Sequence, residues 1–172
     1  MSKLDILIAP DPRLKQIAQP VERVDDGVRR LMDDMLETMY AAPGIGLAAP
    51  QVGRLVRVIV VDVAEKDEPP KPYRMANPEI VSASEEACIM NEGCLSLPDF
   101  YADVERPARV TVSYLDENDQ RQMLEADGML ATCIQHEIEH LDGVLFVDHL
   151  TLVKRNIILR KLQKAKRSGA IG

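Results

Sequence analysis

The stretch from Met129 to Leu141 constrains the fold most. As a helix it would be apolar on almost every side, yet it contains a regular set of His and Glu residues. Its residues 136–140 read H-E-I-E-H, an H-E-x-x-H pattern in which His136 and His140 share one face of a helix. The pattern alone also occurs on exposed helices. A helix that is apolar all round is expected to be buried, however, and buried charged groups need partners. We therefore predict a central helix that carries a metal site, with Glu137 beside it as a general base.

Two histidines on one helix need a third ligand from elsewhere in the chain. The candidates are Cys88, Cys94, Cys133, His149 or a carboxylate. Cys94 stands out because Gly93 lets the backbone approach closely, and Pro98 is expected to stop regular structure just beyond it. Cys133 is interpreted more readily as a small core residue, and His149 as structural or exposed. One cysteine and two histidines leave the fourth position of a zinc ion open for water, which is typical of a catalytic site.

Length and composition indicate a single domain over residues 1–172, large enough for a hydrophobic core. Apolar residues make up 46% of the chain and charged residues 28%, as in soluble globular proteins. The first five residues begin no apolar segment of a signal peptide, and the longest uncharged run, Thr38–Gly53, is too short to span a bilayer. Three cysteines do not suggest a disulfide framework, so we expect a cytoplasmic location and no membrane contact.

Apolar spacing predicts a helix near each end of the chain. The N-terminal helix begins at Asp25 or Asp26, either of which can cap it, and a loop at residues 42–46 ends it. The apolar stripe of this helix consists of Val28, Leu31, Met32, Met35, Leu36 and Met39. The C-terminal helix is predicted over residues 151–167. Its apolar side consists of Val153, Ile157, Ile158, Leu162 and Ala165.

Strands are predicted between these helices. They cover Val56–Val63, Met75–Val81, Arg109–Leu115 and Gln120–Ala126, with a hairpin turn at residues 117–119. Residues 64–72 are predicted to form an exposed loop, and Gly143 to cap the central helix. Because strands and helices do not alternate regularly, we expect an α+β fold. It consists of antiparallel β-sheets packed around the buried metal-binding helix, with N-terminal and C-terminal helices.

Charge is distributed unevenly along the chain. The net charge is −7, but residues 154–167 contain seven basic residues and no acidic one. The remaining 14 basic residues face 28 acidic ones, so the rest of the chain has a net charge of −14. Basic tails can contact nucleic acid, and they can equally be a solvated helix face.

Two further segments accompany the helix motif. Residues 44–51 read G-I-G-L-A-A-P-Q and residues 92–96 read E-G-C-L-S. The first is not a phosphate loop, because the Lys-Ser/Thr ending is missing. In this order and spacing, the three segments resemble the signatures of the peptide deformylase family, namely G-x-G-x-A-A-x-Q, E-G-C-L-S and H-E-x-D-H. The resemblance covers nearly the whole chain.

The resemblance implies a metal-dependent hydrolase that removes the N-formyl group from the N-terminal formylmethionine of nascent polypeptides. It implies that Cys94, His136 and His140 bind the metal and that Glu137 is the catalytic acid/base. The side-chain N–H of Gln51 and the backbone N–H of Leu95 would stabilise the oxyanion. The family's usual ion is Fe²⁺. The ligand types suit Zn²⁺ equally well, and Ni²⁺ or Co²⁺ are expected to substitute.

Substrate contacts are also carried over from the family. An apolar pocket for the methionine side chain would involve Met90, Met129, Thr132 and Cys133, although Met90, Met129 and Cys133 could equally be core residues. Ile45, Gly46 and Gly93 are the further substrate-binding candidates.

Two positions depart from the family's usual residues. Glu139 replaces an Asp, with little expected effect because it is neither ligand nor base. Tyr101 stands where many members carry Arg at the mouth of the pocket, so the family's peptide contacts at this position are not carried over to this chain. Some deformylases dock on the ribosome through their C-terminal helix. We therefore expect a monomer that contacts the ribosome near the nascent-chain exit through residues 151–167.

Two other interpretations of the same residues remain. A zinc endopeptidase shares H-E-x-x-H, but a Cys third ligand argues against it. A structural metal domain or ribosome-binding module without catalysis is the second. Glu137 and Gln51 argue against that interpretation, since neither is needed to hold a metal.

Overall fold

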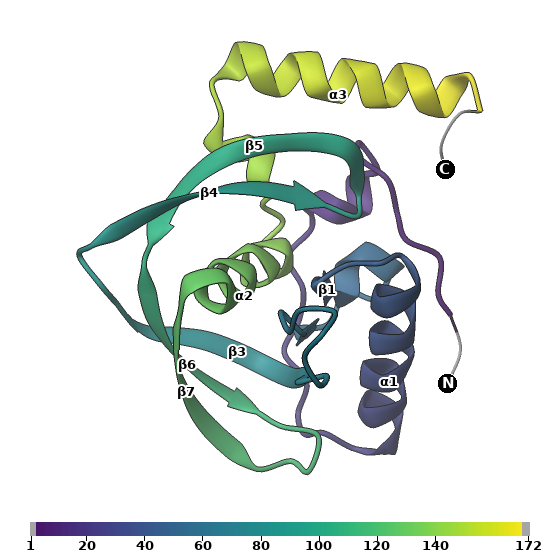
Figure 1. Cartoon of the computed structure of the whole chain (residues 1–172). Coiled ribbons are helices and arrows are strands. Elements are labelled where there is room, and N and C mark those ends of the chain that lie inside the picture. The colour runs from purple at the N-terminus through teal and green to yellow at the C-terminus, as the bar shows by residue number, and fades with distance from the viewer. Residues whose placement is uncertain (1–2, 170–172) are drawn as a thin grey trace.

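The structure, a computed structural model, describes residues 3–169. Figure 1 shows α2 lying between the β4–β5 hairpin and the larger sheet, with α1 and α3 at the periphery. The predicted α+β fold is therefore confirmed. The elements, with η denoting 3-10 helices, are η1 (Pro12–Lys15), α1 (Asp26–Ala41), β1 (Gly46–Ala48), η2 (Ala49–Val52), β2 (Val58–Val61), β3 (Tyr73–Ala83), β4 (Ala87–Cys94), β5 (Leu97–Pro107), β6 (Arg109–Leu115), β7 (Arg121–Asp127), α2 (Gly128–Leu141), η3 (Phe146–His149) and α3 (Leu152–Arg167).

Two antiparallel sheets enclose α2. Within the described residues the larger sheet has five strands in the order β1-β2-β3-β6-β7, and the smaller one is the β4–β5 hairpin. The four predicted strands correspond to β2, β3, β6 and β7; β6 has the predicted bounds, and the other three have shifted ends. The predicted turn at residues 117–119 joins β6 to β7, where Asp119 has a positive φ of 59°.

Strand β2 has apolar side chains on both faces of the sheet, so that α1 packs on one face and α2 on the other. Val58 and Val60 join the methionines of α1 in one hydrophobic cluster, whereas Ile59 and Val61 join Ile134 of α2 in another. Successive residues of a strand point to opposite faces, so an unbroken apolar run is expected where both faces are covered.

Helix α1 begins and packs as predicted. Asp25 is its cap, with Oδ1 accepting a hydrogen bond from the Val28 backbone N at 2.9 Å. The predicted apolar stripe is buried, except that Val28 is only partly covered. This agreement follows from the 3.6-residue period of the helix.

The end of α2 also matches its sequence signal. Gly143 has a φ of +74°, and its N–H donates to the His140 carbonyl at 3.1 Å. The Val144 N–H bonds the Glu139 carbonyl at 2.9 Å. A Cβ at position 143 would lie 2.5 Å from the Lys15 carbonyl oxygen, so both the turn and the close approach favour glycine.

The β4–β5 hairpin was not predicted. The expectation that Pro98 stops regular structure is wrong, because β5 runs from Leu97 to Pro107. Cys94 pairs with Leu97, and the next pair is Gly93 with Tyr101, so three residues of β5 bulge out between these pairs. A bulge accommodates a proline, which has no N–H to donate to the ladder.

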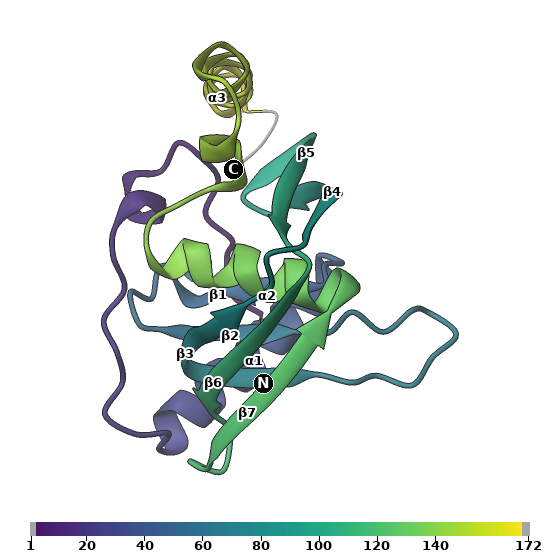
Figure 2. The ribbon, with the colours of Figure 1, turned by 90° about the vertical axis from the view of Figure 1, so that its left-hand side faces the viewer.

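Helix α3 is confirmed, but its predicted apolar side is wrong in part. Thr151 is its N-terminal cap, accepting a hydrogen bond from the Lys154 N at 3.3 Å. Leu162 is 1% exposed, whereas Val153 is 69% and Ile157 is 45% exposed. Figure 2 shows α3 end-on, above the hairpin and apart from the larger sheet, so only part of its circumference finds a packing partner.

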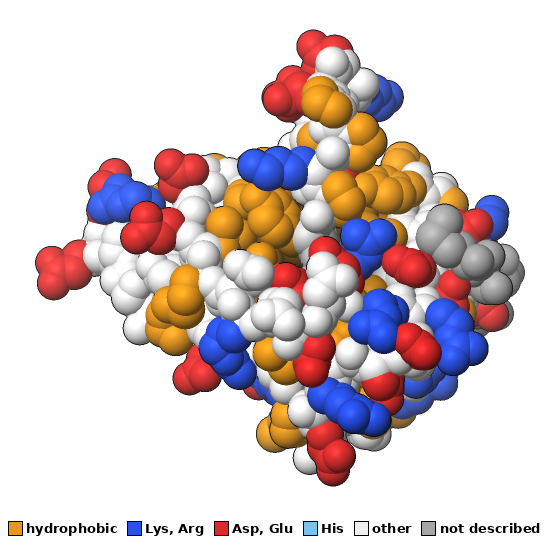
Figure 3. Space-filling view, turned by 90° about the horizontal axis from the view of Figure 1, so that it is seen from below, with side chains coloured by type: hydrophobic (Ala, Val, Ile, Leu, Met, Phe, Trp, Pro, Cys, Tyr) orange, Lys and Arg blue, Asp and Glu red, His pale blue; other side chains and the backbone are white. Residues whose placement is uncertain are grey.

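The outer surface is mixed in character. Figure 3 shows acidic and basic side chains interspersed with apolar groups over the face opposite α3. Among residues 3–169, no helix combines the length and the apolar character that a bilayer crossing requires.

Candidate metal centre

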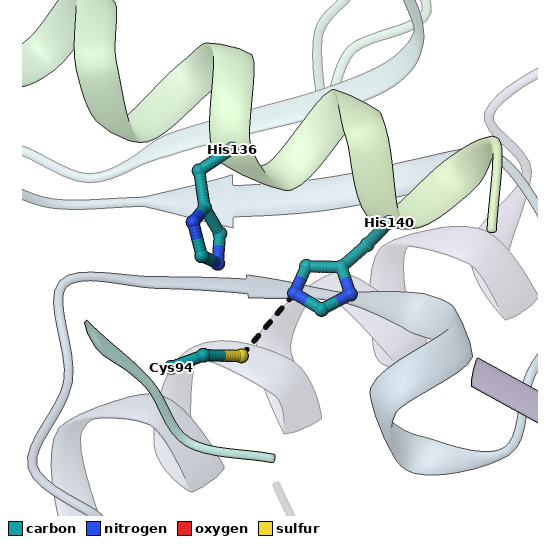
Figure 4. Close-up of side chains that lie close together, drawn as sticks. All are labelled: Cys94, His136 and His140. Atoms are coloured by element: carbon teal, nitrogen blue, oxygen red, sulfur yellow. Dashed lines mark hydrogen bonds between the residues drawn. The ribbon is translucent and has the colours of Figure 1, made fainter. Parts of the chain in front are cut away.

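Cys94, His136 and His140 come together at the face of α2 that lies towards the hairpin (Figure 4). Their ligand atoms all lie within 4.8 Å of one another, and Cys94 Sγ is 3.3 Å from His140 Nε2. The two histidines are one helical turn apart, so their rings point the same way. Cys94 is the last residue of β4, where the bulge turns the chain beside the helix.

The donor set fits a divalent metal ion. Ligands of a tetrahedral ion bonded at about 2.0–2.3 Å lie about 3.3–3.6 Å apart, close to the observed Cys94–His140 separation. Burial lowers the pKa of His140 well below its usual value, which favours the neutral imidazole that binds metals. Burial alone would also lower the pKa of His136. The carboxylate of Glu137 and hydrogen bonds to Cys94 and Glu92 outweigh it and raise that pKa well above the usual value. The carboxylates near His136 thus stabilise positive charge at that ring.

A buried ion pair holds the ring of His136. Its Nδ1 is 3.0 Å from Glu92 Oε1, which leaves Nε2 for a metal. Arg106 donates to both oxygens of Glu92, through Nε at 2.7 Å and Nη2 at 2.9 Å. Burial alone would raise the pKa of Glu92, but the bonds to His136 and Arg106 lower it. Glu92 is thus a carboxylate that fixes the orientation of the imidazole.

Glu137 is buried beside the ligands with an unused acceptor. Its Oε1 has no hydrogen-bond partner among residues 3–169. Burial, followed by the charge of Glu92 and opposed by His136 and Arg106, raises the pKa of Glu137 to about 7. A carboxyl group of this pKa can exchange a proton near neutral pH.

Gln51 reaches the cluster from η2. Its Oε1 accepts a hydrogen bond from the Ala48 N at 2.9 Å, which fixes the direction of the amide. Its Nε2 is 3.1 Å from Ser96 Oγ and 3.4 Å from Cys94 Sγ. An amide N–H is therefore held next to the proposed ligands. Leu95, the other predicted oxyanion donor, follows Cys94 directly and lines the same cavity.

One cavity of about 830 Å³ opens onto the cluster. All the predicted substrate-binding residues line it, namely Ile45, Gly46, Gly93, Met129, Thr132 and Cys133. Met90 is not among the lining residues, but its Sδ is 3.2 Å from Thr132 Oγ1. His140 is fully buried behind the cavity wall.

Two glycines leave room that a side chain would fill. A Cβ at Gly46 would lie 2.5 Å from Glu137 Oε2 and 2.6 Å from Cys133 Sγ. A Cβ at Gly93 would lie 2.4 Å from Tyr101 Cε1. Tyr101 lines the cavity and is 67% exposed, so its ring lies over Gly93 at the mouth.

Sequence patterns missed part of the site. Arg106 also donates through Nη1 to Glu139 Oε1 at 2.8 Å, and both oxygens of Glu139 are 2.9 Å from His149 Nε2. Glu92 lies in a recognised motif, which could have signalled its role. No local pattern marks Arg106 or His149.

Comparisons with known proteins agree with this geometry. The family model for polypeptide deformylase matches residues 3–156. A peptide deformylase from Mesorhizobium japonicum is 53% identical over 167 residues, which cover 97% of this chain and 95% of that one. The crystal structure of peptide deformylase from Ehrlichia chaffeensis has a TM-score of 0.93 and 42% identity, covering 99% of this chain and 100% of the other.

A second structure of the Ehrlichia chaffeensis protein, in complex with actinonin, has a TM-score of 0.93 and 44% identity, covering 97% of this chain and 99% of that one. The family model's match over residues 3–156 includes every residue of the cluster and of the cavity lining. On this evidence, the chain belongs to the polypeptide deformylase family.

Proposed function

We propose that this protein hydrolyses the N-formyl group of the N-terminal formylmethionine of nascent polypeptides and releases formate. The observation that carries the proposal is the meeting of Cys94, His136 and His140 with the unpaired carboxylate of Glu137 at one cavity. Family membership supports the same reaction.

We propose that Cys94 Sγ and the Nε2 atoms of His136 and His140 hold one divalent ion. Such an ion would supply Lewis-acid catalysis, activating water and polarising the formyl carbonyl. Fe²⁺ is our expectation, with Zn²⁺, Ni²⁺ or Co²⁺ able to substitute. Since the ligand atoms do not discriminate among these ions, metal analysis of protein purified without oxygen tests the identity. Faster loss of activity in air from iron-loaded than from nickel-loaded protein would support Fe²⁺.

The remaining chemistry belongs to three groups of the chain. Glu137 accepts the proton of the attacking water at its free oxygen and returns it to the amine that leaves. The Gln51 amide N–H and the Leu95 backbone N–H donate to the oxygen of the formyl group as negative charge develops there. The hydrogen bond from the Ala48 N–H to Gln51 supports this role, because it keeps the amide N–H directed at the cluster.

The cavity supports methionine as the first residue of the substrate. Met129, Thr132 and Cys133 give it a largely apolar wall for a thioether chain, while Ile45, Gly46 and Gly93 let a peptide backbone approach. Burial raises the pKa of Cys133 well above the usual value, and the charges of Glu137 and Glu92 add to this. Cys133 is therefore a neutral wall residue.

A formate-release assay on a formyl-Met peptide tests the proposal against a zinc endopeptidase. We expect formate and an intact deformylated peptide. Internal cleavage without formate would favour the endopeptidase. Metal binding without either product would favour a structural metal domain. Actinonin, which is in complex with the relative in its crystal structure, provides a ligand whose effect on formate release can be compared.

We also propose that α3 docks the enzyme on the ribosome and that it works there as a cytoplasmic monomer. Five cations of α3 are exposed, namely Lys154, Arg160, Lys161, Lys164 and Arg167. Leu152, Val153 and Ile157 are exposed on the same helix. A partner with phosphates and some apolar surface would complement such a face.

A further inference from the structure

The ion pairs around His136 form a closed circuit. His136 contacts Glu92, Glu92 pairs with Arg106, and Arg106 pairs with Glu139. Glu139 is three residues after His136 on α2, so the helix itself closes the ring. His149 of η3 holds the carboxylate of Glu139 from the outer side.

This circuit joins the two elements that supply the proposed ligands. Cys94 comes from the β4–β5 hairpin, whereas His136 and His140 come from α2. Glu92 and Arg106 belong to the two strands of that hairpin. Among the described residues, the hydrogen bonds of the circuit therefore link the hairpin to α2 at two points, one at His136 and one at Glu139.

Burial makes the circuit stiff. The side chains of Glu92 and Arg106 are each 5% exposed, and Glu139 is 26% exposed. A buried cation and carboxylate with several hydrogen bonds tolerate little displacement, because each lost bond leaves a desolvated charge. Arg106 has three nitrogens in planar geometry, of which two face Glu92 and one faces Glu139.

We propose that Glu139, acting through Arg106, is a positioning residue that keeps the Cys94-bearing hairpin at metal-binding distance from His136 and His140. Without Glu139, Glu92 is the remaining hydrogen-bond partner of the Arg106 guanidinium among residues 3–169, and the second link between hairpin and helix is lost. The three ligands would then spread over a wider range of separations. The metal would be held less firmly, although no ligand has been removed. The inference rests on the proposed metal-dependent function.

The experiment uses the full chain loaded with Co²⁺, whose visible spectrum reports the arrangement of its ligands. Glu139→Ala and Glu139→Gln should release Co²⁺ to excess chelator about 10–100-fold faster than the wild type, since outer contacts of ligands typically have that effect. Their Co²⁺ absorption should also change. Glu139→Asp, which keeps the charge with a shorter reach, should restore most of the retention. Glu105→Ala, which removes an exposed carboxylate from the neighbouring position of β5, should behave as wild type.

Thermal melting of the metal-free proteins separates positioning from general stability. A loss of stability without faster Co²⁺ release would overturn the inference, as would wild-type release and spectrum in Glu139→Ala. If Glu139→Ala does not fold, the isosteric Glu139→Gln decides. Formate release by the wild type tests the reaction independently. If the wild type binds Co²⁺ but makes no formate, the proposed function is refuted. The Co²⁺ release rates of the Glu139 variants relative to the wild type would still test the positioning role of Glu139.

Discussion

Glu137 is the residue on which the proposed chemistry depends most directly. Its carboxyl group is buried with a pKa of about 7, and one oxygen has no partner among the described residues. Glu137→Ala should retain the metal, because Cys94, His136 and His140 remain. It should lower kcat by about 10²–10⁴-fold, the usual contribution of an acid/base group. Metal content and kcat on a formyl-Met peptide are measured together, and near-normal turnover at full metal loading would refute the assignment.

Gly46 tests the packing behind Glu137. In Gly46→Ala the new Cβ would collide with Glu137 Oε2 and Cys133 Sγ, at 2.5 and 2.6 Å. The carboxylate must move, and a displacement of about 1 Å can reduce turnover about 10²-fold. Gly27→Ala is the matched control, because its Cβ would have an ordinary contact of 3.4 Å with Asp25. Equal kcat values for the two variants would show that Glu137 has room to adjust.

At the scale of single elements, the sequence predicted the helices and strands whose apolar spacing shows which face is buried. Helices α1 and α2 are of this kind. The one-sided apolar stripe of α1 predicts that one face is buried, and the apolar surface of α2 predicts that the whole helix is buried. The β4–β5 hairpin was missed. Its exposed and covered positions do alternate, but the charged residues Glu92 and Arg106 occupy buried ones, so the sequence shows no clean alternation of apolar and polar side chains.

The residues of the site also fall into two groups, those that the sequence predicted and those that it could not predict. The motifs predicted that Cys94, His136, His140 and Glu137 would meet, and the structure brings them together. Arg106 could not be predicted, because a long-range ion pair leaves no spacing pattern in the sequence. Its pairing with Glu92 becomes visible only once the hairpin has formed.

Hydrogen bonds that attach α3 to the rest of the molecule meet at the carboxylate of Asp148, so they are expected to depend on pH. Asp148 of η3 accepts hydrogen bonds from Lys15, from Arg155 Nε at 2.7 Å and from the Leu145 N at 2.9 Å. Burial alone would raise the pKa of Asp148, but these partners lower it below its usual value. A lowered pKa in the folded state stabilises the protein above the unfolded-state pKa. That contribution is lost as pH falls through the folded-state pKa.

Asp148→Asn should therefore lower the free energy of unfolding by about 1–2 kcal/mol at pH 7, the range for charge-assisted bonds that are partly exposed. The difference from wild type should shrink as the pH falls below about 4. Urea unfolding at several pH values measures it. Asp67→Asn, in the exposed loop between β2 and β3, is the control. A difference that is constant from pH 7 to pH 3 would contradict the ionic origin.

For the whole molecule, the charge pattern is the feature that the fold organises in space. The sequence separates seven cations at residues 154–167 from a remainder of net charge −14. The structure puts those cations on a helix at one end of the molecule (Figure 1). Two of them also bind the body, since Arg155 pairs with Asp148 and Lys166 Nζ donates to the Ile8 carbonyl at 3.0 Å. The other five are exposed. A surface rich in phosphate would therefore attract α3 and repel the acidic body, which orients the enzyme as it approaches.

Charge reversal on α3 tests this orientation. The variant with Arg160, Lys161, Lys164 and Arg167 changed to Glu should lose co-sedimentation with ribosomes, while its kcat on short formyl peptides stays near that of the wild type. The matched control changes Arg23, Arg30, Arg54 and Lys66, four exposed cations outside α3, by the same total charge. It should still co-sediment. Wild-type binding should also weaken steeply with salt, because each neutralised phosphate releases counterions. Equal loss in both variants would indicate an effect of net charge alone, and unchanged co-sedimentation of the α3 variant would leave its cations as a solvated face.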